Sequence, residues 1–134
     1  MDTFSEIAEH VEAHFNVVHK EKFVLGLEVP ISETRRQSVF LAELKDDDDR
    51  RILRLETTVC PLGEQDPVKV LRVNLLLRGG YLAIGDMEGV PFLKLCDNLQ
   101  VRHLSAAALS DRIKRLAKLG DEMEETLTHG HDYF

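Results

Sequence analysis

The 134-residue sequence has no tryptophan, two cysteines and four prolines, and it has no apolar run long enough to cross a membrane. A bilayer-spanning helix needs about 20 consecutive apolar residues, so we expect no membrane contact. Cys60 and Cys96 are too few for the disulfide framework of a small secreted domain and suit a reducing compartment. The acidic N-terminus MDTFSEIAEH is unlike a signal peptide. We therefore expect a cytoplasmic protein.

Basic residues are also scarce, with 17 lysines and arginines against 24 acidic residues, a net charge of −7. Phosphate contacts supply most of the affinity of nucleic-acid binders, so this balance argues against a nucleic-acid partner. Apolar residues make up 43% of the chain, which is enough for a core. The length fits a single domain spanning residues 1–134, with residues 128–134 as a flexible tail.

Apolar periodicity predicts a first helix over residues 3–18, in which Asp2 or Thr3 caps the start. Its stripe is formed by residues spaced three or four apart: Phe4, Ile7, Val11, Phe15 and Val18. Strand-like runs follow at 23–29, 37–45 and 51–60, and the acidic residues 46–49 between the second and third form an exposed hairpin loop. The second run is apolar on both faces, with Val39 and Leu41 on one and Phe40, Ala42 and Leu44 on the other.

Asp66 and Pro67 mark a helix start, and Gly79 marks its end, so residues 67–78 are predicted as a helix. A buried strand is the competing interpretation, because valine and leucine dominate the segment. As a helix it has two apolar sides, one with Val68, Leu71 and Leu75 and the other with Val70, Val73 and Leu77. Two such sides require two partners, of which a second subunit is one candidate.

Runs at 81–85 and 92–96 flank a turn and predict a hairpin. A last helix begins near Leu104 or Ser105 and has an apolar stripe interrupted only by Gly120. The order α-β-β-β-α-β-β-α predicts an α+β, two-layer domain with a five-stranded antiparallel sheet and helices on one face.

Few residues suggest catalysis. Glu6, His10 and His14 follow one edge of the first helix and could centre a small metal-dependent enzyme, but a solvated helix edge explains the same pattern. His129 and His131 in the tail, and the aspartates at 46–49, are weaker metal candidates. No phosphate-binding glycine loop, nucleophile elbow or C-x-x-C motif occurs. We expect no enzyme, no cofactor and no metal.

Cys60 and Cys96 each end a strand and have no cationic neighbour in sequence, so they are interpreted as buried apolar side chains. The more informative feature is an apolar surplus on the second strand and the middle helix. A two-layer domain buries one face of its sheet, and an exposed apolar patch usually marks a partner site. Homodimerisation and a site for another protein account for this surplus equally well.

Three segments resemble the middle of class I type III secretion chaperones, the Tir-chaperone type. They are the helix residues Val70-Leu71-Arg72-Val73-Asn74-Leu75-Leu76-Leu77, the turn and strand Gly79-Gly80-Tyr81-Leu82-Ala83-Ile84, and the strand Phe92-Leu93-Lys94-Leu95. The element order also matches, so the resemblance covers nearly the whole chain. One departure is the last helix, whose first half is basic through Arg112, Lys114, Arg115 and Lys118.

The resemblance implies a non-enzymatic homodimer that holds an extended segment of a secreted effector in apolar grooves. Its two-fold interface would involve the middle helix, with Val70, Val73, Asn74 and Leu77 as contact residues. The groove would lie on the first helix and on strand positions Val24, Val39, Leu41, Phe92 and Lys94. A cytosolic regulatory or stress-associated protein on the same fold, with no role in secretion, is the alternative.

Overall fold

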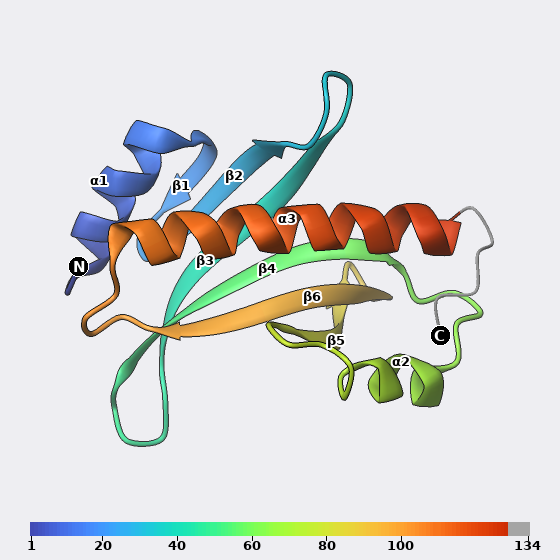
Figure 1. The fold of residues 1–134 in the computed structure, drawn as a ribbon. Helices are drawn as coiled ribbons and strands as arrows, with labels where there is room; N and C mark the ends of the chain where they lie inside the picture. The colour runs from blue at the N-terminus through green and yellow to red at the C-terminus, as the bar shows by residue number, and fades with distance from the viewer. Residues whose placement is uncertain (129–134) are drawn as a thin grey trace.

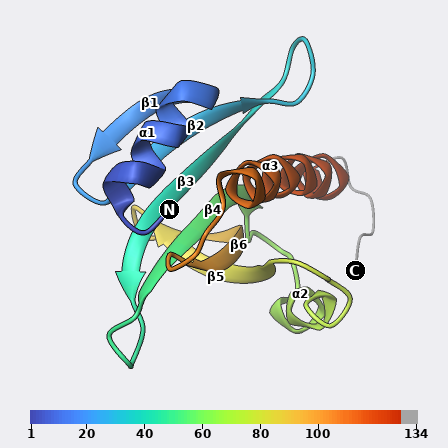
Figure 2. The same cartoon turned by 60° about the vertical axis from the view of Figure 1, so that its left-hand side comes forward.

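The computed structural model describes residues 1–128 as one antiparallel sheet with helices packed against one of its faces (Figures 1 and 2). The elements are α1 (Phe4–His14), β1 (Asn16–Glu21), β2 (Val24–Pro30), β3 (Arg36–Lys45), β4 (Arg51–Pro61), α2 (Pro67–Val73), β5 (Tyr81–Met87), β6 (Val90–Gln100) and α3 (Ala106–Thr128). The predicted α+β class and element order are confirmed. The sheet has six strands, in the order β1-β2-β3-β4-β6-β5, which corrects the predicted five.

The additional strand is β1, which occupies residues predicted to continue the first helix. Thr3 caps α1 by accepting a hydrogen bond from the backbone N–H of Glu6 at 3.1 Å, and the helix ends at His14. Phe15 is already extended, and Val17 pairs with Leu27 of β2. Valine is β-branched and favours a strand, so pairing with β2 prevails over the helical spacing of the apolar residues.

The middle helix forms as predicted but is shorter. Asp66 caps it by accepting from the N–H of Val68 at 3.0 Å, with Pro67 in the first turn. It ends at Val73 instead of reaching residue 78, and the chain then turns toward β5. Gly80 has a φ of +82°, and a Cβ there would lie 2.9 Å from the carbonyl oxygen of Cys96, so only glycine fits this turn.

The core lies between the sheet and the helices that cover it. Helix α3 crosses β3, β4 and β6, while α1 packs beside β1 and β2 (Figure 2). The predicted α3 stripe is buried at Leu109, Ile113, Leu116 and Met123. Gly120 belongs to the same stripe because a Cβ there would lie only 2.6 Å from Cγ2 of Thr57. The glycine therefore lets α3 approach β4 closely.

In the part of the chain that the structure describes, no helix is long and apolar enough to cross a membrane. The predicted tail lies outside the described residues except for Thr128, the last residue of α3. The candidate metal ligands His129 and His131 also lie outside them.

Candidate protein-binding surfaces

The face of the sheet opposite α1 and α3 is uncovered within residues 1–128, and we call it the open face (Figures 1 and 2). Side chains alternate between faces along each strand, so the strand register identifies its members. Its apolar part over β2, β3 and β4 comprises Val24, Phe40, Ala42, Leu44 and Ile52. Phe40 is 41% exposed although it is a large aromatic residue. Exposed apolar residues that lie together in this way often mark an interaction site.

The five residues predicted to bind a partner divide between the two faces. Val24, Phe92 and Lys94 lie on the open face and are half-buried. Val39 and Leu41 point the other way and are completely buried in the core. The sequence of β3 is apolar on both faces, so it does not tell which face is buried. In the structure, the helices α1 and α3 cover the face that holds Val39 and Leu41. The large apolar residues that β3 exposes on the open face are therefore Phe40 and Leu44.

Charged side chains divide the open face. The ammonium group of Lys94 lies 2.9 Å from Oε1 of Glu56, and Nε of Arg54 donates to Oδ1 of Asn98 at 3.2 Å. Asn98 in turn donates to the hydroxyl of Tyr81 at 3.1 Å. These polar pairs separate the apolar part over β2 to β4 from a second apolar group at the β5–β6 hairpin. That group comprises Met87, Val90 and Phe92.

The middle helix presents a different side to solvent than the one predicted as a dimer interface. Val70 and Val73 are 1% and 5% exposed and pack into the core. Leu77 is partly buried against the core. The Asn74 side chain accepts from the N–H of Leu82 at 2.6 Å and donates to its carbonyl at 3.2 Å, which ties α2 to β5.

The exposed apolar residues of this region form what we call the α2 patch. It consists of Val68, Leu71, Leu75 and Leu76, which are 54%, 58%, 84% and 74% exposed. The sequence had already grouped Val68, Leu71 and Leu75 on one side of the helix. The signal that distinguishes the two sides is Asn74, because its side chain has to face β5.

A shallow groove runs between α1 and the β1–β2 hairpin. Its volume is about 390 Å³, and its apolar walls include Phe4, Ala8 and Phe23. The rings of Phe4 and Phe23 meet edge to face with centroids 5.9 Å apart. Lys20 and Glu12 form an ion pair of 2.6 Å across the groove. The groove therefore has a mixed apolar and polar lining.

The two histidines of α1 form hydrogen bonds within the chain. Nε2 of His10 lies 2.8 Å from Oγ of Ser110 on α3, and Nδ1 of His14 lies 2.9 Å from the carbonyl oxygen of His10. Burial, and secondarily the neighbouring His14, lowers the pKa of His10. Glu6 receives a hydrogen bond from the Thr3 hydroxyl. Among the described residues, no group of three acidic, histidine or cysteine side chains is placed to hold a metal ion.

The thiols and the acidic loop also have structural explanations. Cys60 and Cys96 are unpaired and buried, and burial raises the pKa of Cys96 to about 11, so its thiol stays protonated near neutral pH. In the 46–49 loop, Asp46 accepts from the backbone N–H groups of Asp48 and Arg50, which lowers the pKa of its carboxyl group. Arg50 also pairs with Asp46 and Asp48, at 3.0 Å in each case.

Comparison with known proteins yields similarity of structure, whereas no family model and no curated protein matches the sequence. The chain is similar to a protein in the HopA1-SchA chaperone-effector complex, with 19% identity, a TM-score of 0.57 and coverage of 92% of this chain and 89% of the other. It is similar to a protein in the ExsC-ExsE complex, with 15% identity, a TM-score of 0.67 and coverage of 95% and 97%.

Two further solved structures show the same likeness. One is the Yersinia pestis type III secretion chaperone SycH in complex with a stable fragment of YscM2, with 17% identity, a TM-score of 0.61 and coverage of 90% and 99%. The other is YbjN from E. coli, described as a candidate transcription regulator, with 10% identity, a TM-score of 0.58 and coverage of 95% and 93%. Over nearly its whole length, the chain has the fold of type III secretion chaperones.

Proposed function

We propose that the protein is a non-enzymatic, cytoplasmic, homodimeric chaperone-like protein that holds an extended segment of a protein partner. The observation that carries this proposal is the apolar surface outside a core that is already complete, above all the α2 patch with Leu75 84% exposed. The similar solved structures include chaperone–effector complexes, which supports a protein as the partner. Binding requires no cofactor, because apolar burial and hydrogen bonding supply the free energy.

The α2 patch is the proposed dimer interface. Val68 and Leu71 extend from α2, and Leu75 and Leu76 extend from the turn that follows it. No element of residues 1–128 covers these four side chains, and a second copy would bury them by two-fold symmetry. The residues on the opposite side of this segment would support the interface indirectly, because they hold α2 on the sheet. They are Val70, Val73, Asn74 and Leu77.

Sedimentation velocity at micromolar concentration tests the dimer. We expect a species of twice the chain mass, and a monomer for the double variant Leu71→Glu/Leu75→Glu, whose dissociation constant should rise by about 100-fold or more. Lys69→Glu on the same helix is the matched control, because Lys69 is exposed and outside the patch. A wild-type monomer at this concentration, or a dimer that survives the double variant, would overturn the interface.

The partner segment is proposed to lie on the open face and in the α1 groove. Val24, Phe92 and Lys94 remain proposed contacts, together with Phe40 and Leu44. A secreted effector is the first candidate, held through its N-terminal segment before export. The test is limited proteolysis of the product of a neighbouring gene, with and without this protein. We expect a protected N-terminal segment, and protection should fall when Phe40 is changed to Asp.

The likeness to YbjN favours a second candidate, a regulatory protein whose partner stays in the cytosol. Secretion assays separate the two. Loss of the gene should abolish export of the bound protein if it is an effector, and should leave export unchanged if the partner is a resident protein.

A further inference from the structure

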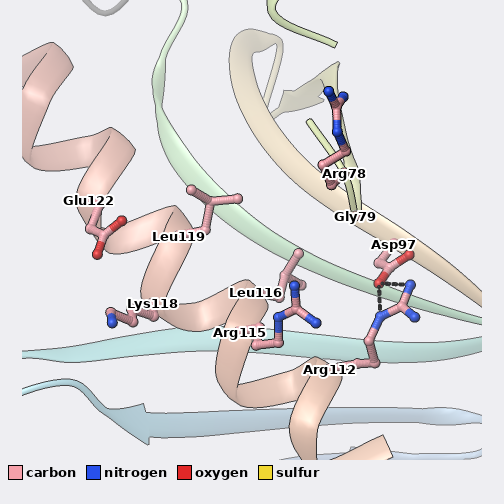
Figure 3. Close-up of a pocket in the computed structure, with 9 residues that line it drawn as sticks. All are labelled: Arg78, Gly79, Asp97, Arg112, Arg115, Leu116, Lys118, Leu119 and Glu122. Atoms are coloured by element: carbon pink, nitrogen blue, oxygen red, sulfur yellow. Dashed lines mark hydrogen bonds and ion pairs between the residues drawn. The ribbon is translucent and has the colours of Figure 1, made fainter. Parts of the chain in front are cut away.

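A basic cleft lies between α3 and the turn that links α2 to β5, away from the α1 groove. Its volume is about 400 Å³, and its lining includes four cationic side chains, those of Arg78, Arg112, Arg115 and Lys118 (Figure 3). Only two carboxylates, Asp97 and Glu122, share the lining. A cationic cleft on a chain of net charge −7 is a local reversal of the overall charge. The proposed dimer and groove do not use it.

One of the four cations is fixed in place. Asp97 is 8% exposed on β6, and its Oδ2 accepts from Nε of Arg112 at 2.7 Å and pairs with Nη2 at 2.6 Å (Figure 3). This contact holds the guanidinium at the mouth of the cleft and leaves its other N–H groups available to a ligand. Asp97 therefore positions Arg112.

The other cations are weakly engaged. Arg115 lies 3.6 Å from Asp111 in a pair that is largely exposed on both sides. Within residues 1–128, Arg78 and Lys118 have no carboxylate in ion-pair distance, and Arg78 only donates to the carbonyl of Leu75 at 3.5 Å. Exposed pairs of this kind contribute little free energy, so a carboxylate from a partner would not have to displace a strong internal contact.

The cleft also has an apolar floor. Leu116 and Leu119 of α3 line it, and Gly79 forms the opposite wall without a side chain, as Figure 3 shows. A free phosphate would use the charges but not this floor. The glycines Gly79 and Gly80 follow α2, so they do not gather amide groups at a helix start as a phosphate-binding loop does. The combination fits carboxylate side chains interspersed with apolar ones.

We infer that this basic cleft binds an acidic, extended segment of the protein partner, with Arg112 and Arg115 receiving carboxylates and the half-buried Leu119 receiving an apolar side chain. The inference rests on the proposed function, since it names the chemistry of a segment that such a chaperone would hold. It also gives a role to the basic first half of α3, the departure from the secretion-chaperone pattern noted in the sequence.

Fluorescence anisotropy with synthetic peptides tests the inference. The probe is a labelled peptide of repeated Asp-Leu-Glu-Ser, and the comparison peptide is repeated Asn-Leu-Gln-Ser. We expect the acidic peptide to bind the wild-type protein and the neutral peptide not to compete. Arg115→Glu/Lys118→Glu should weaken binding by roughly tenfold. The charge-matched control Lys45→Glu/Arg102→Glu, at exposed positions outside the cleft, should leave binding unchanged.

Chemical shifts of the ¹⁵N-labelled protein locate the peptide. We expect the largest changes at the backbone amides of Arg78, Gly79 and the Arg112–Leu119 turns of α3. Equal binding of the neutral peptide, equal weakening by the control variant, or displacement by inorganic phosphate or an oligonucleotide at the same charge concentration would each overturn the inference. The proteolysis assay separates the two proposals.

If the wild type and the Arg115→Glu/Lys118→Glu variant protect the partner from proteolysis equally, the inference about the cleft is wrong and the proposed function stands. If the acidic peptide binds at the cleft but no partner is protected from proteolysis, the proposed function is wrong.

Discussion

The two faces of the sheet differ in what they contribute to the molecule. On the covered face, Leu25, Leu41 and Leu55 are completely buried under α1 and α3. On the open face, the neighbouring positions hold Phe40 at 41% exposure and the ion pair between Glu56 and Lys94. The covered face thus supplies the apolar burial that stabilises the fold, and the open face is free to be used for binding. Substitutions that separate these roles test the comparison.

The largest effect should come from truncating the covered face. Leu55→Ala removes a completely buried side chain, and we expect it to lower the free energy of unfolding by about 2–5 kcal/mol. Urea denaturation measures this loss. Phe40→Ala on the adjacent strand is the comparison, and it should cost less than about 1 kcal/mol while weakening partner binding. Equal losses for the two variants would show that the open face also supports the fold.

The close approach of α3 to the sheet gives the next effect. Gly120→Ala places a methyl group 2.6 Å from Cγ2 of Thr57, so either the helix or the strand has to move. We expect a loss of about 1–3 kcal/mol in the free energy of unfolding. Gly79→Ala is the control, because a Cβ there meets nothing within 4 Å. If Gly120→Ala is as stable as Gly79→Ala, helix packing is looser than the structure indicates.

Much of the covered face could be predicted from the sequence, because burial imposes a period. The apolar stripes of α1 and α3 and the strands β2, β3 and β4 follow from it, whereas the start of α2 follows from the capping chemistry of Asp66. Strand β1 could not be found in this way. It lies at the edge of the sheet, and its residues are mostly exposed, so alternation is absent. Val18 also continues the spacing of the helix stripe.

The candidate site was harder to predict than the fold. Both faces of β3 and both sides of α2 are apolar, so hydrophobic periodicity alone does not distinguish the face that becomes core. Which face becomes core depends on two contacts between separate elements. One is the packing of α3 on β3 and β4, which are distant from it in sequence, and the other is the hydrogen bond between Asn74 and Leu82, which joins α2 to β5. The basic cleft was equally hidden, because Asp97 and Arg112 come from different elements.

A smaller effect is expected on the open face. Glu56→Gln removes the charge facing Lys94, and because both side chains are partly exposed we expect a loss of about 0.2–1 kcal/mol in unfolding free energy. The loss should shrink further in high salt, as urea titrations with added sodium chloride would show. A loss as large as that of Gly120→Ala would contradict the view that the open face is not needed for stability.

The smallest effect concerns pH and the contact between α1 and α3. The lowered pKa of His10 means that the folded state favours the neutral ring. The contribution of neutral His10 to the free energy of unfolding is therefore complete above the ordinary pKa of 6.5. It is lost as the pH falls from 6.5 toward the lowered pKa of the folded state. Unfolding midpoints of the wild type should therefore drop slightly more than those of His10→Gln between about pH 7.5 and about pH 5.5. Parallel curves would rule out a contribution from His10.

The irregular edge strand has a consequence for how copies of the chain meet one another. Pairing of β1 with β2 shifts register between Val17 and His19, and β1 carries the charged residues Lys20 and Glu21. A bulged, charged edge offers an incoming strand only short stretches of regular hydrogen bonding. Growth of sheets edge on edge is therefore disfavoured on this side, even though the chain leaves much apolar surface exposed. The protein therefore exposes apolar surface for binding, while its β1 edge does not favour the strand pairing that builds fibres.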